Sequence, residues 1–322
     1  GSGGPISLQA ASLTLEKAGT RSSIISADGN FGANAGSITL DVSGDIAIRD
    51  NSFLSASTSG AGSGGNISVQ GGSLTIAGDG SPTGITGILS QSSSSGAGGN
   101  VDLDITGAIT MTSGGRVSTS NSGAGTGGDL RVNGGSIRID AQGTGVFTGI
   151  AARSNGIGTG GDGGSIRVTT PGSLELRDGG VISADTCNNG NGGDIFVQAR
   201  SLLADGSNGI ANTGINALQS QNASGNTGDI VVNVTESLTL IGGGQIDNST
   251  FGSGNAGSVR VTSDAITIDR AGRNLYTGIG SDSDGSGMGG SVDVTASTVQ
   301  LRNGGLISTG ALNAGDAGSI RV

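Results

Sequence analysis

The chain has 322 residues, 68 of them glycine, and its 15 basic and 25 acidic residues leave a formal net charge of −10. One cysteine and no histidine exclude histidine-based catalysis, zinc sites and disulfide frameworks. The acidic charge argues against nucleic acid as a partner, and because no run reaches about 18 apolar residues, membrane insertion is not predicted either.

A short phrase recurs along the whole chain: small residues, often two glycines, then a polar residue and an apolar-x-apolar segment. Its first apolar positions lie 28 to 36 residues apart, about 31 on average, and long and short units alternate. Glycine-rich disorder would not keep this phase, so the pattern predicts a repeat architecture. The eleven anchor positions are Ile6, Ile38, Ile67, Val101, Leu130, Ile166, Ile195, Ile230, Val259, Val292 and Ile320.

Each unit contains three apolar-x-apolar segments, which in the unit that begins at Ile166 are 166–168, 174–176 and 181–183. Period-2 alternation in such short pieces predicts strands joined by turns, and no apolar helical stripe persists. Short units share a turn phrase such as Arg-Asp-Gly-Gly (177–180). Long units carry an insert before a Thr-Gly-Ile phrase such as 148–150.

Three short strands with one apolar side each cannot bury themselves alone, so they must stack coil upon coil. We therefore predict an all-β fold: a single parallel β-helix, or β-solenoid, of about ten to eleven coils with three short strands each and three parallel sheets. A propeller is the main competitor, but its blades are longer and carry aromatic signatures. The expected single domain, 1–322, divides into five two-coil super-repeats at about 6–66, 67–129, 130–194, 195–258 and 259–322.

Three phrases, at 163–168, 172–183 and 190–197, resemble the repeats of filamentous haemagglutinin-type exoproteins, and especially the glycine-rich, S-layer-like surface proteins of cyanobacteria. The resemblance covers all eleven anchors and lies in repeat composition. It implies a right-handed shaft that a Gram-negative bacterium secretes by a two-partner route to its surface, for adhesion, biofilm formation or surface coating. The Asn-Pro-Asn-Gly-type segment of the family's secretion domain does not occur here, so the export route rests on the resemblance alone.

The sequence offers only weak candidates for chemistry. Asp102 and Asp104 are the best carboxylate pair, but their spacing places both on the outer face of one strand. Asp282 and Asp284 could hold one adventitious calcium ion, although aspartate-rich turns are more often solvated. Cys187 has no histidine to act as its base, and six aromatic residues are too few to line a long sugar cleft. We expect no catalytic residue, no enzyme activity, no cofactor and no functional metal site.

Three functions remain in order of preference. The first is an extracellular structural shaft of a surface adhesin or matrix fibre, with flanking domains of a longer exoprotein and cell-surface or matrix glycans as partners. The second is a self-assembling filament or surface-layer subunit, since the chain begins and stops in the same phase of the repeat without a polar cap. The third is a polysaccharide-binding or polysaccharide-cleaving β-helix.

Overall fold

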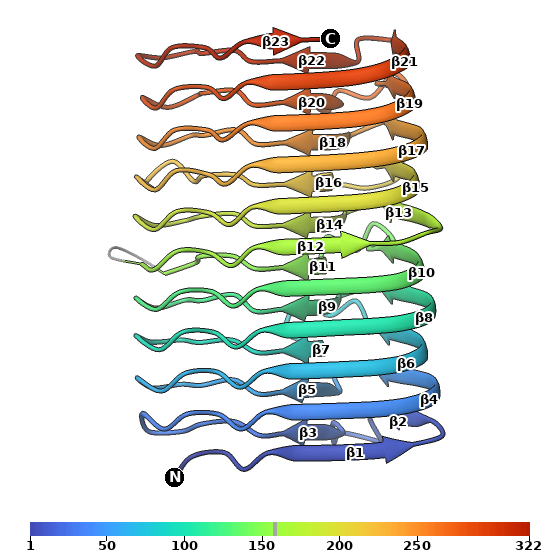
Figure 1. Cartoon of the computed structure of the whole chain (residues 1–322), viewed down its shortest axis with the longest axis vertical. Helices are drawn as coiled ribbons and strands as arrows, with labels where there is room; N and C mark the ends of the chain where they lie inside the picture. The colour runs from blue at the N-terminus through green and yellow to red at the C-terminus, as the bar shows by residue number, and fades with distance from the viewer. Residues whose placement is uncertain (157–159) are drawn as a thin grey trace.

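The computed structural model describes residues 1–156 and 160–322, which form a single stack of coils (Figure 1). Neighbouring coils pair through parallel strands in both of its sheets. The predicted parallel β-solenoid, with its alternation of long and short coils, is therefore confirmed. The described part of the chain contains no helix that is long and apolar enough to cross a membrane.

The first sheet carries the anchor residues, and its strands lie directly above one another in chain order. Ile6 pairs with Ile38, Ile38 with Ile67, and the register continues in this way to Ile320, so all eleven anchors are confirmed. The strands are β1 (Ile6–Ala10), β2 (Leu13–Leu15), β4 (Ile38–Arg49), β6 (Ile67–Ala77), β8 (Val101–Thr112), β10 (Leu130–Asp140), β12 (Ile166–Thr169), β13 (Ser173–Arg177), β15 (Ile195–Asp205), β17 (Ile230–Ile241), β19 (Val259–Asp269), β21 (Val292–Arg302) and β23 (Ile320–Arg321).

The second sheet is formed by the third apolar segment of each coil. Its ten strands are shorter, and they also stack in chain order. They are β3 (Ile24–Ser26), β5 (Phe53–Ser55), β7 (Thr86–Leu89), β9 (Gly115–Ser118), β11 (Thr148–Ala151), β14 (Gly180–Ser183), β16 (Thr213–Asn216), β18 (Gly244–Asp247), β20 (Gly278–Gly280) and β22 (Leu306–Ser308).

The expectation of three separate strands and three sheets needs correction. In most coils the first two apolar segments form one bent strand, because they are joined by a shift of register such as that between Gly134 and Ser136 rather than by a turn. β12 and β13 remain separate, and Pro171, which has no N–H for the ladder, lies between them. The structure therefore has two sheets, and a glycine-rich arm takes the place of the third side.

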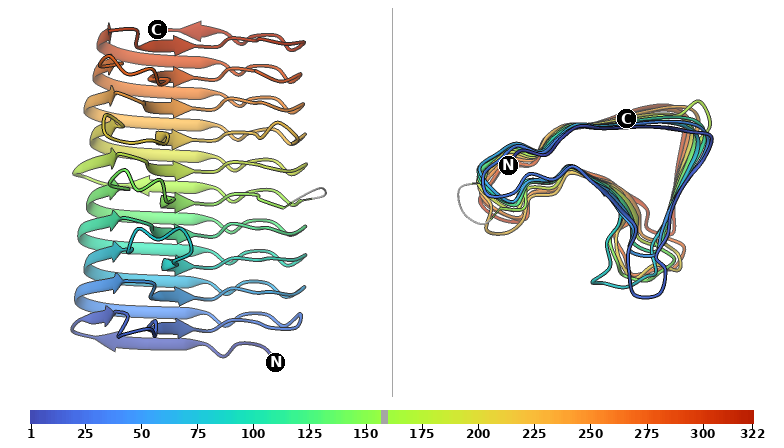
Figure 2. Two further views of the ribbon diagram at one scale, coloured as in Figure 1. Left: turned by 180° about the vertical axis from the view of Figure 1, so that it is seen from behind. Right: turned by 90° about the horizontal axis from the view of Figure 1, so that it is seen from below.

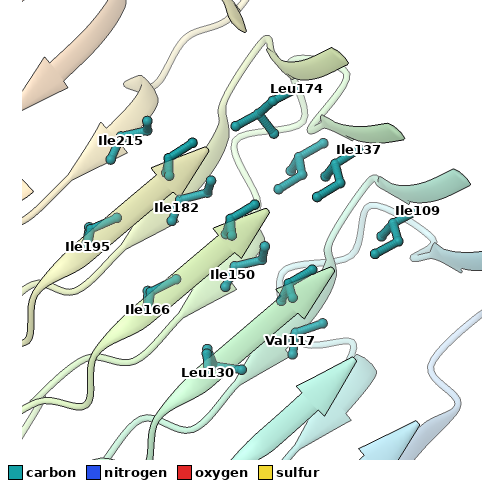
Figure 3. Packing of buried hydrophobic residues seen from close by; sticks show 14 of the residues in the cluster. Ile109, Val117, Leu130, Ile137, Ile150, Ile166, Leu174, Ile182, Ile195 and Ile215 are labelled. Atoms are coloured by element: carbon teal, nitrogen blue, oxygen red, sulfur yellow. The ribbon is translucent and has the colours of Figure 1, made fainter. Parts of the chain in front are cut away.

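A continuous apolar core runs through the stack. Inward residues of both sheets lie in vertical ladders of Ile, Val and Leu, such as Ile150, Ile182 and Ile215 in the second sheet (Figure 3). These three side chains are 0% exposed. Fully burying such a side chain stabilises the fold by about 1.5–3 kcal/mol, and each coil repeats the gain.

The arm is the narrow extension of every coil, seen end-on in Figure 2. Neighbouring coils approach so closely there that a Cβ on Gly128 would lie well under 3.0 Å from the carbonyl oxygen of Gly99, and one on Gly99 equally close to that of Gly65. A second glycine ladder has the same geometry three residues earlier, as at Gly125 above Gly96. This close approach explains the glycine content: a side chain would separate the coils.

Polar side chains complete the hydrogen bonding of the arm. On its outer edge, Asn100 Oδ1 accepts the N–H of Asp129 at 2.9 Å, and Asp129 Oδ1 accepts that of Ser165 at 2.9 Å. Inside it, the buried hydroxyl of Thr186 donates to the carbonyl of Gly190 at 2.6 Å. The asparagine, aspartate, serine and threonine residues of the repeat thus satisfy backbone groups that no sheet ladder satisfies.

The two kinds of coil differ at the turn before the second sheet. In a short coil, Asp178 and Gly179 both have positive φ, 48° and 101°, which turns the chain sharply. In the long coil above, the buried hydroxyl of Thr213 accepts the N–H of Gly179 at 2.8 Å. Gly214 has a φ of 144°, and a Cβ there would clash with Gln245 O. The Thr-Gly-Ile phrase therefore joins each long coil that carries it to the short coil before it.

Candidate binding groove on the second sheet

The outer face of the second sheet lies between two projections, the arm on one side and the inserts of the long coils on the other (Figure 2). The inserts are 16–23, 78–85, 141–147, 206–212 and 270–277. Two cavities lie along this face. One, of about 450 Å³, spans the early coils from Asp28 to Asn155, and another, of about 460 Å³, lies between the inserts that contain Phe147 and Asn212. We call this face the groove.

Side chains alternate along each strand, so outward residues form vertical rows on the floor of the groove. The row nearest the inserts contains Arg116, between Gly87 and Gly149, and two further rows follow towards the arm. The sheet row lies on the strands of the second sheet, and the arm-side row lies two residues later, next to the arm. The sheet row is Ser26, Ser55, Leu89, Ser118, Ala151, Ser183, Asn216, Asp247, Gly280 and Ser308. The arm-side row is Asp28, Ser57, Gln91, Ser120, Arg153, Asp185, Leu218, Ser249, Asp282 and Gly310.

Some polar side chains of the arm-side row have a structural role. Ser57 Oγ accepts the N–H of Gln91 at 3.1 Å, and Asp185 Oδ1 accepts that of Leu218 at 2.9 Å. Ser120 Oγ accepts the N–H of Arg153 at 3.1 Å. These side chains join one coil to the next where the regular ladder of the second sheet ends. A small hydroxyl or carboxylate at these positions is therefore no sign of a ligand by itself.

The early coils present hydroxyl and amide groups to the groove. Gln91 Nε2 donates to Ser118 Oγ at 2.8 Å, and Ser118 Oγ donates to Ser120 Oγ at 3.0 Å. At the first coil, Asp28 accepts the hydroxyl of Ser55 at 2.5 Å. Ser55, Ser118 and Ser120 are only 3%, 3% and 7% exposed, so these hydroxyls bond to neighbouring side chains and form a neutral lining with one carboxylate at its end.

The middle of the groove holds two arginines with different surroundings. The Arg153 guanidinium lies 4.3 Å from the centre of the Phe147 ring, and its Nε lies 3.2 Å from Asp185 Oδ2. Arg116 Nη2 donates to the Gly84 carbonyl at 3.0 Å, while its buried Nε has no partner among the described residues. Burial, together with the charge of Arg153, lowers the pKa of Arg116. Arg153 is neutralised locally, and Arg116 is not.

The late coils are acidic. Burial raises the pKa of Asp247 to about 7, and the nearby charge of Asp282 raises it further. The hydrogen bond that Ser249 donates to Asp247 at 2.5 Å lowers the pKa and opposes part of this shift. Burial also raises the pKa of Tyr276, whose hydroxyl lies 3.3 Å from Ser308 Oγ. Ser308 in turn donates to Asp282 at 2.8 Å. A protonatable carboxyl and a phenol therefore share one polar network at this end of the groove.

The sequence candidates lie in different places. Asp102 and Asp104 lie on the outer face of the first sheet, and Asp102 is 3.6 Å from Arg131. Asp282 lies in the groove, whereas Asp284 lines a cavity of about 430 Å³ on the arm with Phe251. Within the described residues no group of three or more side chains is arranged to hold a metal ion.

Cys187 and the aromatic residues do not lie close together either. Cys187 is exposed, and its sulfur accepts the hydroxyl of Ser220 at 3.2 Å. Phe147 lies beside the groove, whereas Phe196 lies on the first sheet under Arg167, with 4.1 Å between the guanidinium carbon and the ring centre. The aromatic residues thus form no common platform.

Sequence reasoning missed Arg116, Asp247 and Tyr276. The signal for the first two was present, since each lies next to the inward residue of a third apolar segment and so points outward. What was absent was any sign that this face is flanked by the arm and the inserts. Alternation along a strand identifies the outer face and does not reveal what stands beside it.

Comparison with known proteins identifies no relative: no protein-family model, no curated protein and no solved structure matches the chain. The parallel β-solenoid is therefore established by the structure alone, and the resemblance to filamentous haemagglutinin-type repeats stays a prediction.

Proposed function

We propose that the chain is a non-catalytic structural shaft of a bacterial surface exoprotein or matrix fibre. The observation that supports this proposal is the uniformity of the stack. The anchors keep one register from Ile6 to Ile320, and one apolar core connects the coils. A structure that repeats the same contacts along one axis is suited to holding two things a set distance apart.

Stiffness would come from three sets of contacts that act together. Backbone hydrogen bonds of parallel strands run along the axis, the apolar ladders fill the centre, and the glycine ladders of the arm prevent neighbouring coils from sliding. Bending the shaft would strain all three at once, because packed interiors resist deformation. Adhesion, surface location and two-partner secretion rest on the repeat resemblance. Flanking domains of a longer exoprotein are the expected partners.

Solution scattering on a deletion series tests this proposal. Removing one super-repeat, 130–194, should leave a folded rod that is shorter by two coils, about 10 Å at about 4.8 Å per strand. Removing 130–174 instead breaks the phase of the repeat and should cost folding. A hinged or globular particle for the intact chain would contradict the shaft. Rods that lengthen with protein concentration would support the filament of stacked copies.

A further inference from the structure

The cavity of about 460 Å³ between the inserts 141–147 and 206–212 lies over a short coil, which has no insert of its own. We call this cavity the pocket. Its volume falls within the range of about 300–1,000 Å³ that is typical of small-molecule sites. Ala141, Val181 and Ala211 contribute apolar surface to its lining, and Arg153 and Asp185 stand on the side of the arm.

The pocket is open because the short coil beneath it carries a small side chain. Val181 occupies the row that holds Arg116 and Gln245 in the neighbouring short coils, and each of the three stands between glycines of the long coils. The Arg116 side chain extends as far as the carbonyl of Gly84 in the insert below. Val181 is too short to reach an insert in this way, so the space beside it stays empty.

Arg153 presents two free donors to the pocket. Its Nε donates to Ser183 Oγ at 2.6 Å and lies 3.2 Å from Asp185 Oδ2, while the guanidinium stacks on the Phe147 ring. These contacts fix the guanidinium, and its side chain is 26% exposed, against 59% for Arg131 on the first sheet. Nη1 and Nη2 form no hydrogen bond with the described residues, and both reach solvent.

The acceptors that line the pocket are largely in use. Asp185 Oδ1 accepts the N–H of Leu218 at 2.9 Å, and its Oδ2 accepts the hydroxyl of Ser183 at 2.5 Å. Asn216 Oδ1 accepts a side-chain amide of the next coil at 2.8 Å, which leaves its Nδ2 as a donor. Asn212 is the exception, with an exposed amide that can donate or accept. Free donors therefore prevail, and they match an ionised carboxylate, which only accepts.

A guanidinium of this stack can hold two carboxylates at once. Arg177 lies 3.0 Å from Glu175 and 3.5 Å from Asp205. Arg153 pairs with Asp185 alone among the described residues, so one carboxylate from a ligand would complete the same arrangement. The described lining of the pocket contains no second cation, and the ligand therefore carries a single charge.

We propose that the pocket binds a small monocarboxylate with a short aliphatic body. The carboxylate accepts hydrogen bonds from Nη1 and Nη2 of Arg153, in the bidentate arrangement that a guanidinium favours. The aliphatic body lies against Ala141, Val181 and Ala211, where its apolar surface is removed from water. The ligand is bound and not converted, and the site does not depend on whether the stack serves as a shaft.

Calorimetric titration of the intact chain with isovalerate tests the proposal. Isovalerate should bind with a dissociation constant in the millimolar range or below. Isovaleramide, which has the same shape without the charge, should bind at least about tenfold more weakly.

Two variants separate the guanidinium from the cavity. Arg153→Gln should weaken isovalerate binding at least about tenfold, because the charged donors are lost. Val181→Gln should have a similar effect while leaving the guanidinium in place, because it brings into the pocket the side chain that Gln245 carries in the next short coil. The matched control is Arg167→Gln. The Arg167 guanidinium also stacks on a phenylalanine ring, 4.1 Å from its centre, but on the first sheet, so this variant should bind like the unchanged chain.

Several results would overturn the proposal. One is a failure of the unchanged chain to bind isovalerate at millimolar concentration. Others are equal binding of isovaleramide, full binding by Val181→Gln, or equal losses in the Arg153 and Arg167 variants. Sulfate that binds as tightly as isovalerate would show an anion site without an apolar pocket. Circular dichroism of each variant separates a loss of binding from a loss of fold, and a chain that folds without binding leaves the shaft proposal untouched.

Discussion

The arm and the groove belong to the same coils, yet their side chains vary to different degrees. In the arm, glycine returns in two ladders from coil to coil, as at Gly99, Gly128 and Gly164. In the arm-side row of the groove, Gln91, Ser120 and Arg153 follow one another instead. The glycine ladders of the arm have no room for a side chain, whereas the arm-side row of the groove accepts side chains of different size and charge. Variation in this solenoid is therefore concentrated where packing does not forbid it.

The largest effect should come from the core that both regions share. Ile166→Ala removes a side chain that is 1% exposed from the middle of the stack, and it should lower the free energy of unfolding by about 2–5 kcal/mol. The outward Thr169 of the same strand supplies the control, since Thr169→Ala should change stability by less than about 0.5 kcal/mol. Denaturant unfolding of both variants measures the difference, and equal losses would contradict the inward register.

The arm should tolerate no side chain at its glycine ladders. Gly128→Ala places a Cβ against the carbonyl oxygen of Gly99, and it should destabilise the fold by about 1–3 kcal/mol through forced separation of two coils. Gly4 begins the same ladder and has no atom near its Cβ position, so Gly4→Ala is the matched control and should be nearly neutral. Thermal unfolding measures both. A neutral Gly128→Ala would show that the arm is looser than its geometry indicates.

The acidic end of the groove should make stability depend on pH. The pKa of Asp247 is about 7 in the folded chain and near 4 in the unfolded one, so between these values the folded state holds the extra proton. Stability conferred by this residue is therefore lost as the pH rises from about 4 to about 7. Asp247→Asn removes the effect.

The variant should gain on the order of 1–3 kcal/mol relative to the unchanged chain over that interval. The measurement is the difference between the unfolding free energies of the two proteins at each pH, because carboxylates distant from position 247 contribute equally to both. A difference that stays constant with pH would refute the raised pKa.

The smallest effect concerns Arg116. Arg116→Met replaces an uncompensated cation with an apolar chain, and it should raise stability by about 1 kcal/mol. Arg177 is the comparison, because it pairs with Glu175 at 3.0 Å and Asp205 at 3.5 Å. Arg177→Met should lower stability by up to about 1 kcal/mol. The two changes should have opposite signs in thermal unfolding; the same sign would contradict the cost assigned to the unpaired Arg116.

Much of the fold could be predicted because its cause is local and periodic. The anchors Ile38, Ile67 and Val101 recur with one flanking pattern, and stacking is the arrangement that buries all of them. The joining of the first two segments into one strand could not be read in the same way, since glycines such as Gly134 and Gly135 are typical of a turn as well as of a bulge. The bend is decided by contact with the coils on either side.

For the groove too, part of the arrangement could be predicted from the sequence and part could not. By itself, the sequence determined the solenoid, its register and which residues point outward, because alternation and repeat length are properties of the chain alone. Only the tertiary structure decided that Arg116 stands between two glycines with no ion pair to a carboxylate among the described residues, and that Asp247 lies near Asp282 and Tyr276 from other coils. The physical reason is that charge compensation depends on distances between coils, and residues about thirty positions apart in the chain become neighbours only when the coils stack.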